Sequence, residues 1–187
     1  MLHLLNSIQT LSTGLRECLY DTIEKQTIKK NVYLQKPGEI PNRLHFIETG
    51  LIICYRNSGK RDITSAFRRE GDLLISTDNF YSQTAANEYH ETIEDSILHS
   101  LSYRQLHIIC KEFPEFNIHL RILMERNARL NEELLHLLRT ARAQERYKWI
   151  TERFPDLLER APYTHLASYI GITRGLLYAI KARKERL

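Results

Sequence analysis

The segment YTHLASYIGITRGLLYAIKARKERL, residues 163–187, is the most informative stretch of this sequence. It predicts two short amphipathic helices joined by a tight turn at Gly171. Apolar residues recur at helical spacing at Leu166, Ala167, Ile170, Ile172, Leu176, Leu177 and Ile180. Thr173 stands at the expected N-cap of the second helix, because its hydroxyl can accept a hydrogen bond from an amide of the next turn. This pattern is typical of a helix-turn-helix, whose second helix enters the DNA major groove, although an ordinary helical hairpin shares it.

Positive charge is concentrated in the same carboxy-terminal region. The chain of 187 residues has a formal net charge of +4. Residues 141–187 contain ten Lys or Arg and five Asp or Glu, so the rest of the chain is close to neutral. A basic end on a near-neutral body suits a partner with a phosphate backbone, and it also suits an ordinary solvated surface.

Composition predicts a globular cytoplasmic protein. Hydrophobic residues make up 42% of the chain and charged residues 27%, as in soluble domains. No apolar run is long enough to cross a bilayer, and the amino terminus lacks the basic leader and cleavage site of a secretory signal. Cys18, Cys54 and Cys110 are far apart and match no metal-ligand spacing. We therefore expect reduced, buried thiols in a reducing compartment.

Short strands are expected after an amino-terminal helix. Residues 1–28 carry apolar side chains at three- and four-residue steps, which predicts a helix. From residue 29 to about residue 100, glycines and prolines separate short apolar or alternating runs. The runs predict strands at 32–34, 44–47, 51–55, 63–67, 73–75 and 96–101. Many short strands with regular turns predict an antiparallel roll, sandwich or barrel.

The remaining chain has the pattern of helices, of which the longest runs from Phe116 to Ala141. Its apolar stripe has the 4-3-4-3 spacing of a two-helix coiled coil. The stripe predicts a dimer interface of Leu120, Leu123, Asn127, Leu130, Leu134 and Leu137. Asn127 falls at an a position, where a polar side chain favours a dimer and fixes its register. The alternative is that this stripe packs on the chain's own strands, but Ile122, Leu135 and Leu138 lie off the stripe and are expected to supply that packing.

Several motifs occur in order: Lys36-Pro37-Gly38-Glu39, Leu44–Leu51, Gly71-Asp72, Glu94–Ser96, Phe113–Phe116 and His165–Thr173. The motifs and the order of the elements resemble those of CRP/FNR-type transcriptional regulators, the catabolite activator protein among them, in a short form without a clear β-wing. The resemblance covers nearly the whole chain and implies an α+β fold. We expect a cyclic-nucleotide-binding-like, antiparallel β-roll sensor domain at 1–115, a dimerisation helix at 116–141 and a helix-turn-helix domain at 142–187.

The resemblance also indicates where a ligand would bind. Nucleotide-binding members of the family use a Gly-Glu pair for the ribose and an Arg followed by Ser or Thr for the cyclic phosphate. An ungapped overlay places Ile75-Ser76 and Ala86-Asn87 there, so Ser76, Ala86 and Asn87 are the candidate ligand-binding residues. Without the arginine, the phosphate loses a bidentate, charge-assisted contact. We therefore expect weak cyclic AMP binding or none, and the sequence identifies no other cofactor or effector.

The residues expected to bind double-stranded DNA are Thr173, Arg174, Tyr178, Lys181, Arg183, Lys184 and Arg186. Arg174 keeps a base-reading position of the family and can form a bidentate contact with guanine. Gly175 and Ala179 occupy the positions where the activator has Glu and Arg. The other basic side chains can hold phosphates, which position the protein without specifying a sequence. The implied partners are DNA, a second copy of the chain and RNA polymerase, with no membrane.

No pattern in the sequence indicates an enzyme. The eight histidines are scattered and form no metal-binding pair on one helix, and the serines lack a nucleophile-elbow context. A cupin-like metal enzyme would need His and Glu ligands at strand spacing, which the sequence lacks. The alternative to a DNA-binding regulator is a homodimeric sensor or adaptor whose helix-turn-helix is degenerate and does not bind DNA.

Overall fold

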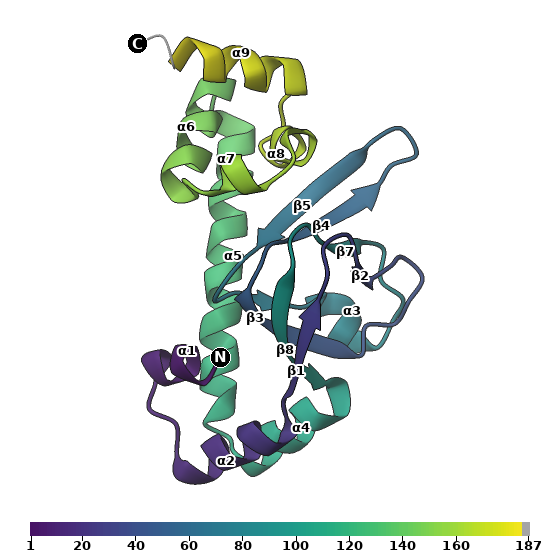
Figure 1. Cartoon of the computed structure of the whole chain (residues 1–187), viewed down its shortest axis with the longest axis vertical. Helices are drawn as coiled ribbons and strands as arrows, with labels where there is room; N and C mark the ends of the chain where they lie inside the picture. Colours follow the sequence, from purple (N-terminus) through teal and green to yellow (C-terminus); the bar gives the residue numbers. More distant parts are fainter. Residues whose placement is uncertain (185–187) are drawn as a thin grey trace.

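Two four-stranded antiparallel sheets form a β-roll in the computed structural model, which describes residues 1–184 (Figure 1). One sheet has the strand order β1-β8-β3-β6, and the other has the order β2-β7-β4-β5. The strands are β1 Glu24–Ile28, β2 Tyr33–Gln35, β3 Arg43–Thr49, β4 Ile52–Asn57, β5 Asp62–Arg68, β6 Leu73–Leu74, β7 Tyr89–Thr92 and β8 Ser96–Ser102. Side chains from both sheets, such as Ile52 and Leu98, form one buried cluster. The α+β class and the β-roll expected from the sequence are confirmed.

The tight connection between β3 and β4 depends on Gly50. Its φ is +107°, a backbone conformation that favours glycine. A Cβ at this position would lie 2.1 Å from Ser96 Oγ. The amide of Gly50 donates to Glu70 Oε1 at 2.8 Å. The absence of a side chain at Gly50 therefore lets Ser96, the first residue of β8, lie directly against the turn between β3 and β4.

Helices surround the long helix α5 (Phe116–Thr140) at its amino-terminal end. They are α1 (Leu2–Ile8), α2 (Thr13–Thr22) and α4 (Tyr103–Glu112), and all lie towards the lower end of Figure 1. Leu5 and Leu15 share a second buried cluster with Phe116 and Leu120 of α5. No helix within residues 1–184 is both long and apolar enough to cross a membrane.

Three segments differ from the prediction. The single helix expected over residues 1–28 is broken between Ile8 and Thr13 into α1 and α2. Residues 24–28 were expected to continue the amino-terminal helix, but they form β1 and pair antiparallel with β8, from Glu24 opposite Ser100 to Ile28 opposite Ser96. Residues 77–82 form the helix α3 (Thr77–Ser82), where no helix was expected. The backbone partners of β1 come from β8, which lies roughly seventy residues further along the chain. A local periodicity cannot reveal such a partner, and the tertiary pairing overrides it.

Four carboxy-terminal helices pack on β4, β5 and the end of α5. They are α6 (Ala143–Arg153), α7 (Leu157–Arg160), α8 (Tyr163–Tyr169) and α9 (Arg174–Lys184). Ile53 and Phe67 of the sheet share one buried cluster with Ile150 and Leu166 of these helices. The Phe67 ring meets that of Tyr169 edge-on, with centroids 5.2 Å apart. The carboxy-terminal helices are therefore seated directly on the β-roll, as Figure 1 shows for α8 beside β5.

Arg160, the last residue of α7, adds charged contacts to this apolar interface between the helices and the sheet. Its guanidinium lies 2.8 Å from Glu70, 2.7 Å from Glu94 and 2.7 Å from Asp156. Glu70 and Glu94 belong to loops of the β-roll, and the carboxylates of Glu94 and Glu70 raise the pKa of Arg160. Ion pairs in such a network hold orientation better than isolated surface pairs do. Arg160 therefore fixes how the carboxy-terminal helices sit on the sheet.

Candidate DNA-binding surface

Helices α8 and α9 form a helix-turn-helix. The turn passes through Gly171, whose φ is +65°. Ile172 N donates to Ala167 O at 2.9 Å, which satisfies a carbonyl at the end of α8. Thr173 caps α9, because its Oγ1 accepts a hydrogen bond from Leu176 N at 3.2 Å. The glycine turn and the threonine cap are placed as the sequence predicts.

The turn is held against the ends of α5 and α6. Arg146 Nη1 donates to Ile170 O at 2.9 Å and to Gly171 O at 3.2 Å. A Cβ at position 171 would lie 2.8 Å from Arg146 Nη1 and 2.8 Å from Leu138 Cδ2. Packing as well as backbone conformation therefore favours glycine here. The turn that precedes α9 therefore lies against Leu138 of α5.

Four of the predicted DNA-binding residues are exposed on α9 or at its N-cap. They are Thr173, Arg174, Tyr178 and Arg183. Leu177 and Ile180, on another face of the helix, are buried. Leu176 was expected in the buried face, but its side chain is 43% exposed. Leu176 lies about 100° of rotation from Leu177, and on α9 this direction points away from the core.

Lys181, a fifth predicted DNA-binding residue, is tied to α8. Its Nζ donates to Tyr163 OH at 2.6 Å and lies 5.2 Å from the centroid of that ring. The Tyr178 ring packs edge-on against Tyr163, with centroids 5.1 Å apart. A phosphate contact by Lys181 would compete with its bond to Tyr163. The predicted roles of the Lys184 side chain and of Arg186 lie outside the described part of the chain.

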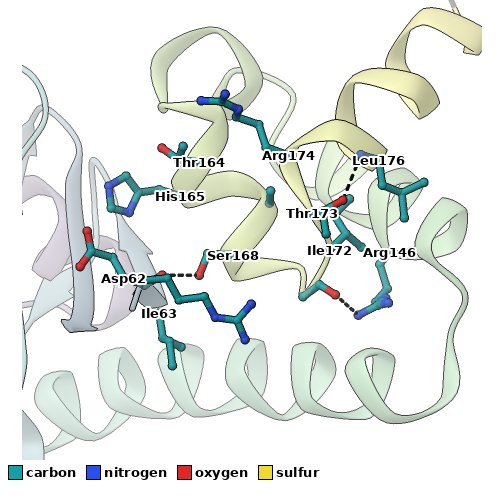
Figure 2. Close-up of a pocket in the computed structure, with 13 residues that line it drawn as sticks. Asp62, Ile63, Arg146, Thr164, His165, Ser168, Ile172, Thr173, Arg174 and Leu176 are labelled. Atoms are coloured by element: carbon teal, nitrogen blue, oxygen red, sulfur yellow. Dashed lines mark hydrogen bonds between the residues drawn. The ribbon is translucent and has the colours of Figure 1, made fainter. Parts of the chain in front are cut away.

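A cavity of about 840 Å³ lies beside the turn, between the β4–β5 hairpin and the start of α9 (Figure 2). Arg61 of the hairpin, Arg146 of α6 and Arg174 of α9 line it. Figure 2 shows the Arg174 side chain near Thr164, while Arg146 points back to the turn. Positive charge therefore continues from α9 onto the hairpin, a segment to which the sequence assigned no role in DNA binding.

The predicted dimer stripe lies on the face of α5 that packs against its own chain. Its members are Leu120, Leu123, Asn127, Leu130, Leu134 and Leu137. Leu120, Leu123 and Leu134 are buried within the chain, and Leu130 and Leu137 are partly buried. Asn127 Nδ2 donates to Leu73 O of β6 at 3.0 Å. Intramolecular packing, the alternative that the sequence left open, accounts for the buried leucines, and their part in a dimer stays a prediction.

A second stripe of α5, one residue further along, is exposed or partly exposed. It has the same 4-3-4-3 spacing and consists of Asn117, Arg121, Met124, Ala128, Asn131, Leu135 and Leu138. Leu135 is 47% exposed and Leu138 is 38% exposed, so the expectation that they pack on the chain's own β-domain was wrong. Tyr81 of α3 lines a groove beside Met124 and Ala128. In this stripe Ala128 and Leu135 are exposed, whereas Met124 packs partly on the chain's own core and Leu138 lies near the Gly171 turn.

A cavity of about 390 Å³ opens into the β-roll. Of the three predicted ligand-binding residues, Ser76 lines the cavity, whereas Ala86 and Asn87 are not part of its lining. The Ala86 backbone pairs with the preceding loop: Gly38 N donates to Ala86 O and Ala86 N donates to Glu39 O, both at 2.9 Å. The position where the family has its phosphate-binding arginine is therefore a small side chain beside a backbone pairing.

Buried polar side chains that sequence reasoning missed form the floor of this cavity. Gln35, His45 and His90 are 6%, 8% and 3% exposed. Gln35 Nε2 donates to Ser76 Oγ, which donates to Glu88 Oε1, both at 2.9 Å. His90 Nε2 pairs with the same carboxylate oxygen at 3.0 Å. Polar residues at inward positions of alternating strands were the available signal, but they lie on segments far apart in the sequence.

Burial and nearby charges set the protonation of this floor. Burial, with the positive charges of His90 and Arg43, lowers the pKa of His45 to about 4. Burial alone would lower the pKa of His90, but Cys54 and Glu88 raise it to about 9. Burial alone would raise the pKa of Glu88, but its bond to His90 lowers it to about 2. At neutral pH the floor therefore holds a neutral His45 beside an ion pair whose charges cancel.

The depressed pKa of His45 predicts that stability falls on acidification. Its pKa is about 4 in the folded chain and 6.5 as a free side chain. Between these values the unfolded chain binds a proton that the folded chain does not, so unfolding is favoured as the pH falls from 6.5 to 4. We expect a slope of up to about 1.4 kcal/mol per pH unit from this group. Urea titrations across that range should show a shallower slope for His45→Asn; an unchanged slope would assign the effect to other histidines.

Comparison with known proteins was made on sequence and on structure. No protein-family model matches the sequence, and no curated protein matches it. Solved structures do match. CLP, described as a c-di-GMP-responsive global regulator of Xanthomonas campestris, superimposes with a TM-score of 0.74 at 12% identity, over 94% of this chain and 92% of that one.

Two structures from Thermus thermophilus are similar as well. Its catabolite activator protein matches with a TM-score of 0.59 at 16% identity, over 98% of this chain and 87% of that one. TTHA1359, a transcriptional regulator of the CRP/FNR family, matches with a TM-score of 0.69 at 16% identity, over 87% of this chain and 86% of that one. With its β-roll, long helix and terminal helix-turn-helix in the same order, the chain has the fold of the CRP/FNR-type transcriptional regulators.

Proposed function

We propose that this chain is a homodimeric, DNA-binding transcriptional regulator of the cytoplasm, with a β-roll that senses a small molecule. The observation that carries the proposal is the first half of α9, where Arg174 and Tyr178 are exposed while Leu177 and Ile180 anchor the helix in the core. The same fold in solved transcriptional regulators supports it.

Arg174 is the residue to which we assign base recognition. It is exposed in the first turn of α9, and the first turns of a recognition helix are the part that contacts base edges. Its guanidinium can donate two hydrogen bonds to guanine O6 and N7. Arg61 lines the same cavity as Arg174, so the β4–β5 hairpin can add a phosphate contact from the sensor domain.

The exposed stripe of α5 is the surface that we assign to dimerisation. Met124, Ala128 and Leu135 occupy it at heptad spacing. In the stripe predicted from the sequence, three of the leucines are already buried within the chain. A two-fold dimer would place two recognition helices about 34 Å apart, in successive major grooves. Leu138 belongs to this stripe and also lies at the Gly171 turn. A change in how the two helices pack would therefore move α9.

Replacing Arg174 tests base readout. We expect Arg174→Ala to weaken binding to a duplex selected from genomic fragments by about 1–3 kcal/mol per contact, roughly 5- to 150-fold. Binding to random DNA should change far less, because phosphate contacts remain. The measurement is a fluorescence anisotropy titration of both duplexes at one fixed salt concentration.

Arg16→Ala is the matched control, since Arg16 is an exposed arginine of α2 at the other end of the molecule (Figure 1). It should leave both affinities unchanged. An equal loss on selected and random DNA for Arg174→Ala would reduce its role to a phosphate contact. If the purified protein retards no duplex at low salt, the alternative function, a homodimeric sensor or adaptor that does not bind DNA, replaces this one.

A further inference from the structure

The geometry of the β-roll cavity points to a ligand class: a small molecule that is not an anion and that presents an N–H or O–H group to Gln35 Oε1 and His45 Nε2. This inference deepens the proposed function, and it rests on that function only for its regulatory consequence. The cavity of about 390 Å³ falls in the size range of small-molecule sites. Ile28, Leu34, Leu74 and Ile75 contribute apolar walls around the polar floor.

The hydrogen bonds of the floor have a fixed direction. Gln35 Nε2 donates to Ser76 Oγ at 2.9 Å and to the backbone carbonyl of Glu88 at 3.3 Å. A carbonyl can only accept, so it fixes the orientation of the Gln35 amide. The amide oxygen, Gln35 Oε1, is left without a donor among residues 1–184. The floor therefore offers an acceptor, and a ligand must supply the donor.

His45 offers a second free atom. Its Nδ1 pairs with Ser100 Oγ at 2.7 Å, and its Nε2 has no partner in the described structure. When Nδ1 carries the proton and donates to Ser100 Oγ, Nε2 is an acceptor. Neither Nε2 nor Gln35 Oε1 is sealed in the protein, since the buried atoms without partners that the described residues contain belong to His119 and Arg146. Both side chains line the cavity and are more than nine-tenths buried. A ligand that displaces water from these two atoms without supplying a donor would leave them unpaired, which costs free energy.

The charges of the lining disfavour an anionic ligand. Arg43 forms two hydrogen bonds with Glu24, at 2.7 and 3.0 Å. His90 is paired with Glu88, and Glu39 accepts a hydrogen bond from Lys36 N at 2.8 Å. An anion would therefore meet no unpaired cation at this floor and would face the Gln35 oxygen. Burying such an unpaired charge is costly.

One sheet links this floor to the helix-turn-helix. His90 of β7 lies opposite Cys54 of β4, and the next residue of β4, Tyr55, points to the opposite face of the sheet. There the Tyr55 ring lies 5.4 Å from that of His165 in α8. Thr64 Oγ1 also pairs with His165 Nδ1, at 2.9 Å. A ligand that shifts β7 would therefore move α8, and DNA affinity would respond if it binds the two arrangements differently.

Two matched pairs of probes test the ligand class on the full chain. Benzamide and benzoate share a shape, but only the amide is uncharged and donates; adenosine and cyclic AMP differ by the anionic phosphate. We expect benzamide and adenosine at about 10 mM, a concentration suited to ligands of few atoms, to shift the imidazole ¹⁵N signals of His45. Benzoate and cyclic AMP should bind at least about tenfold more weakly, because each carries a negative charge that meets no unpaired cation at this floor. Benzoate also leaves the acceptor unpaired. Equal or tighter binding of the anions, or no shift with either uncharged probe, would overturn the proposal.

Gln35→Met removes the acceptor and should weaken benzamide binding about tenfold, whereas Gln144→Met, on the exposed surface of α6, should leave it unchanged. Unchanged binding to Gln35→Met would contradict the assignment. Gln35 also donates a hydrogen bond to Ser76, so Gln35→Met could disturb folding. The comparison of benzamide with benzoate on the unsubstituted chain tests the ligand class independently of the variant. Benzamide should protect His45 from diethyl pyrocarbonate, as read by mass spectrometry, and benzoate should not. Gel shifts on the same samples separate the two proposals. A protein that binds benzamide but retards no duplex would contradict the DNA-binding function and leave the ligand class intact.

Discussion

The chain with both Ala128→Glu and Leu135→Glu is expected to be a monomer with at least about a hundredfold weaker affinity for a two-site duplex. Both residues are exposed on one protomer, so the substitutions leave its core intact. In a two-fold dimer the same positions would meet, and the new carboxylates would face each other. Each lost leucine contact costs about 1.5–3 kcal/mol in addition. Sedimentation velocity measures the first effect and anisotropy on a palindromic site measures the second, where linked binding supplies the avidity.

Tyr20→Glu with Ile108→Glu is the control for that pair. These two residues are 78% and 44% exposed, on α2 and α4, away from the exposed stripe of α5. The control places the same charge on two other exposed positions, so it should remain dimeric and bind DNA normally. A dimer that survives Ala128→Glu with Leu135→Glu would return the interface to the stripe that contains Leu130 and Leu137.

Gly50→Ala is expected to destabilise the β-roll by about 3 kcal/mol or more. A Cβ there would lie 2.1 Å from Ser96 Oγ and 2.8 Å from Ser96 Cα, and the backbone of β8 cannot retreat without breaking its pairing with β1 and β3. Overpacking costs about 1–3 kcal/mol. The positive φ adds about 1–2 kcal/mol for a residue with a Cβ. Urea unfolding followed by circular dichroism gives the free energy.

Gly38→Ala separates strain from crowding. Gly38 has a φ of +90°, close to that of Gly50, but a Cβ there meets nothing within 4 Å. Its substitution should cost only the backbone strain, about 1–2 kcal/mol. If the two variants lose the same stability, the contact with Ser96 contributes nothing and the close approach of β8 relaxes easily.

The local signals in the sequence identified the helix-turn-helix and most strands. Gly171 and Thr173 are placed as expected, because a positive φ and an N-cap each depend on one residue and its immediate neighbours. The β-roll was recognisable from its turns for the same reason. The β1 strand was not, because its hydrogen bonds come from β8, a distant segment that local periodicity cannot report.

For the site, the sequence by itself determined that α5 carries a heptad stripe and that basic residues gather at the chain's end. Only the tertiary structure decided which of two stripes, one residue apart, is covered by the same chain and which is free. Spacing fixes a direction around a helix but not what lies in that direction. The cavity floor follows the same rule: Gln35, His45, Ser76 and His90 come from separate segments, and only the closure of the two sheets brings their polar atoms together.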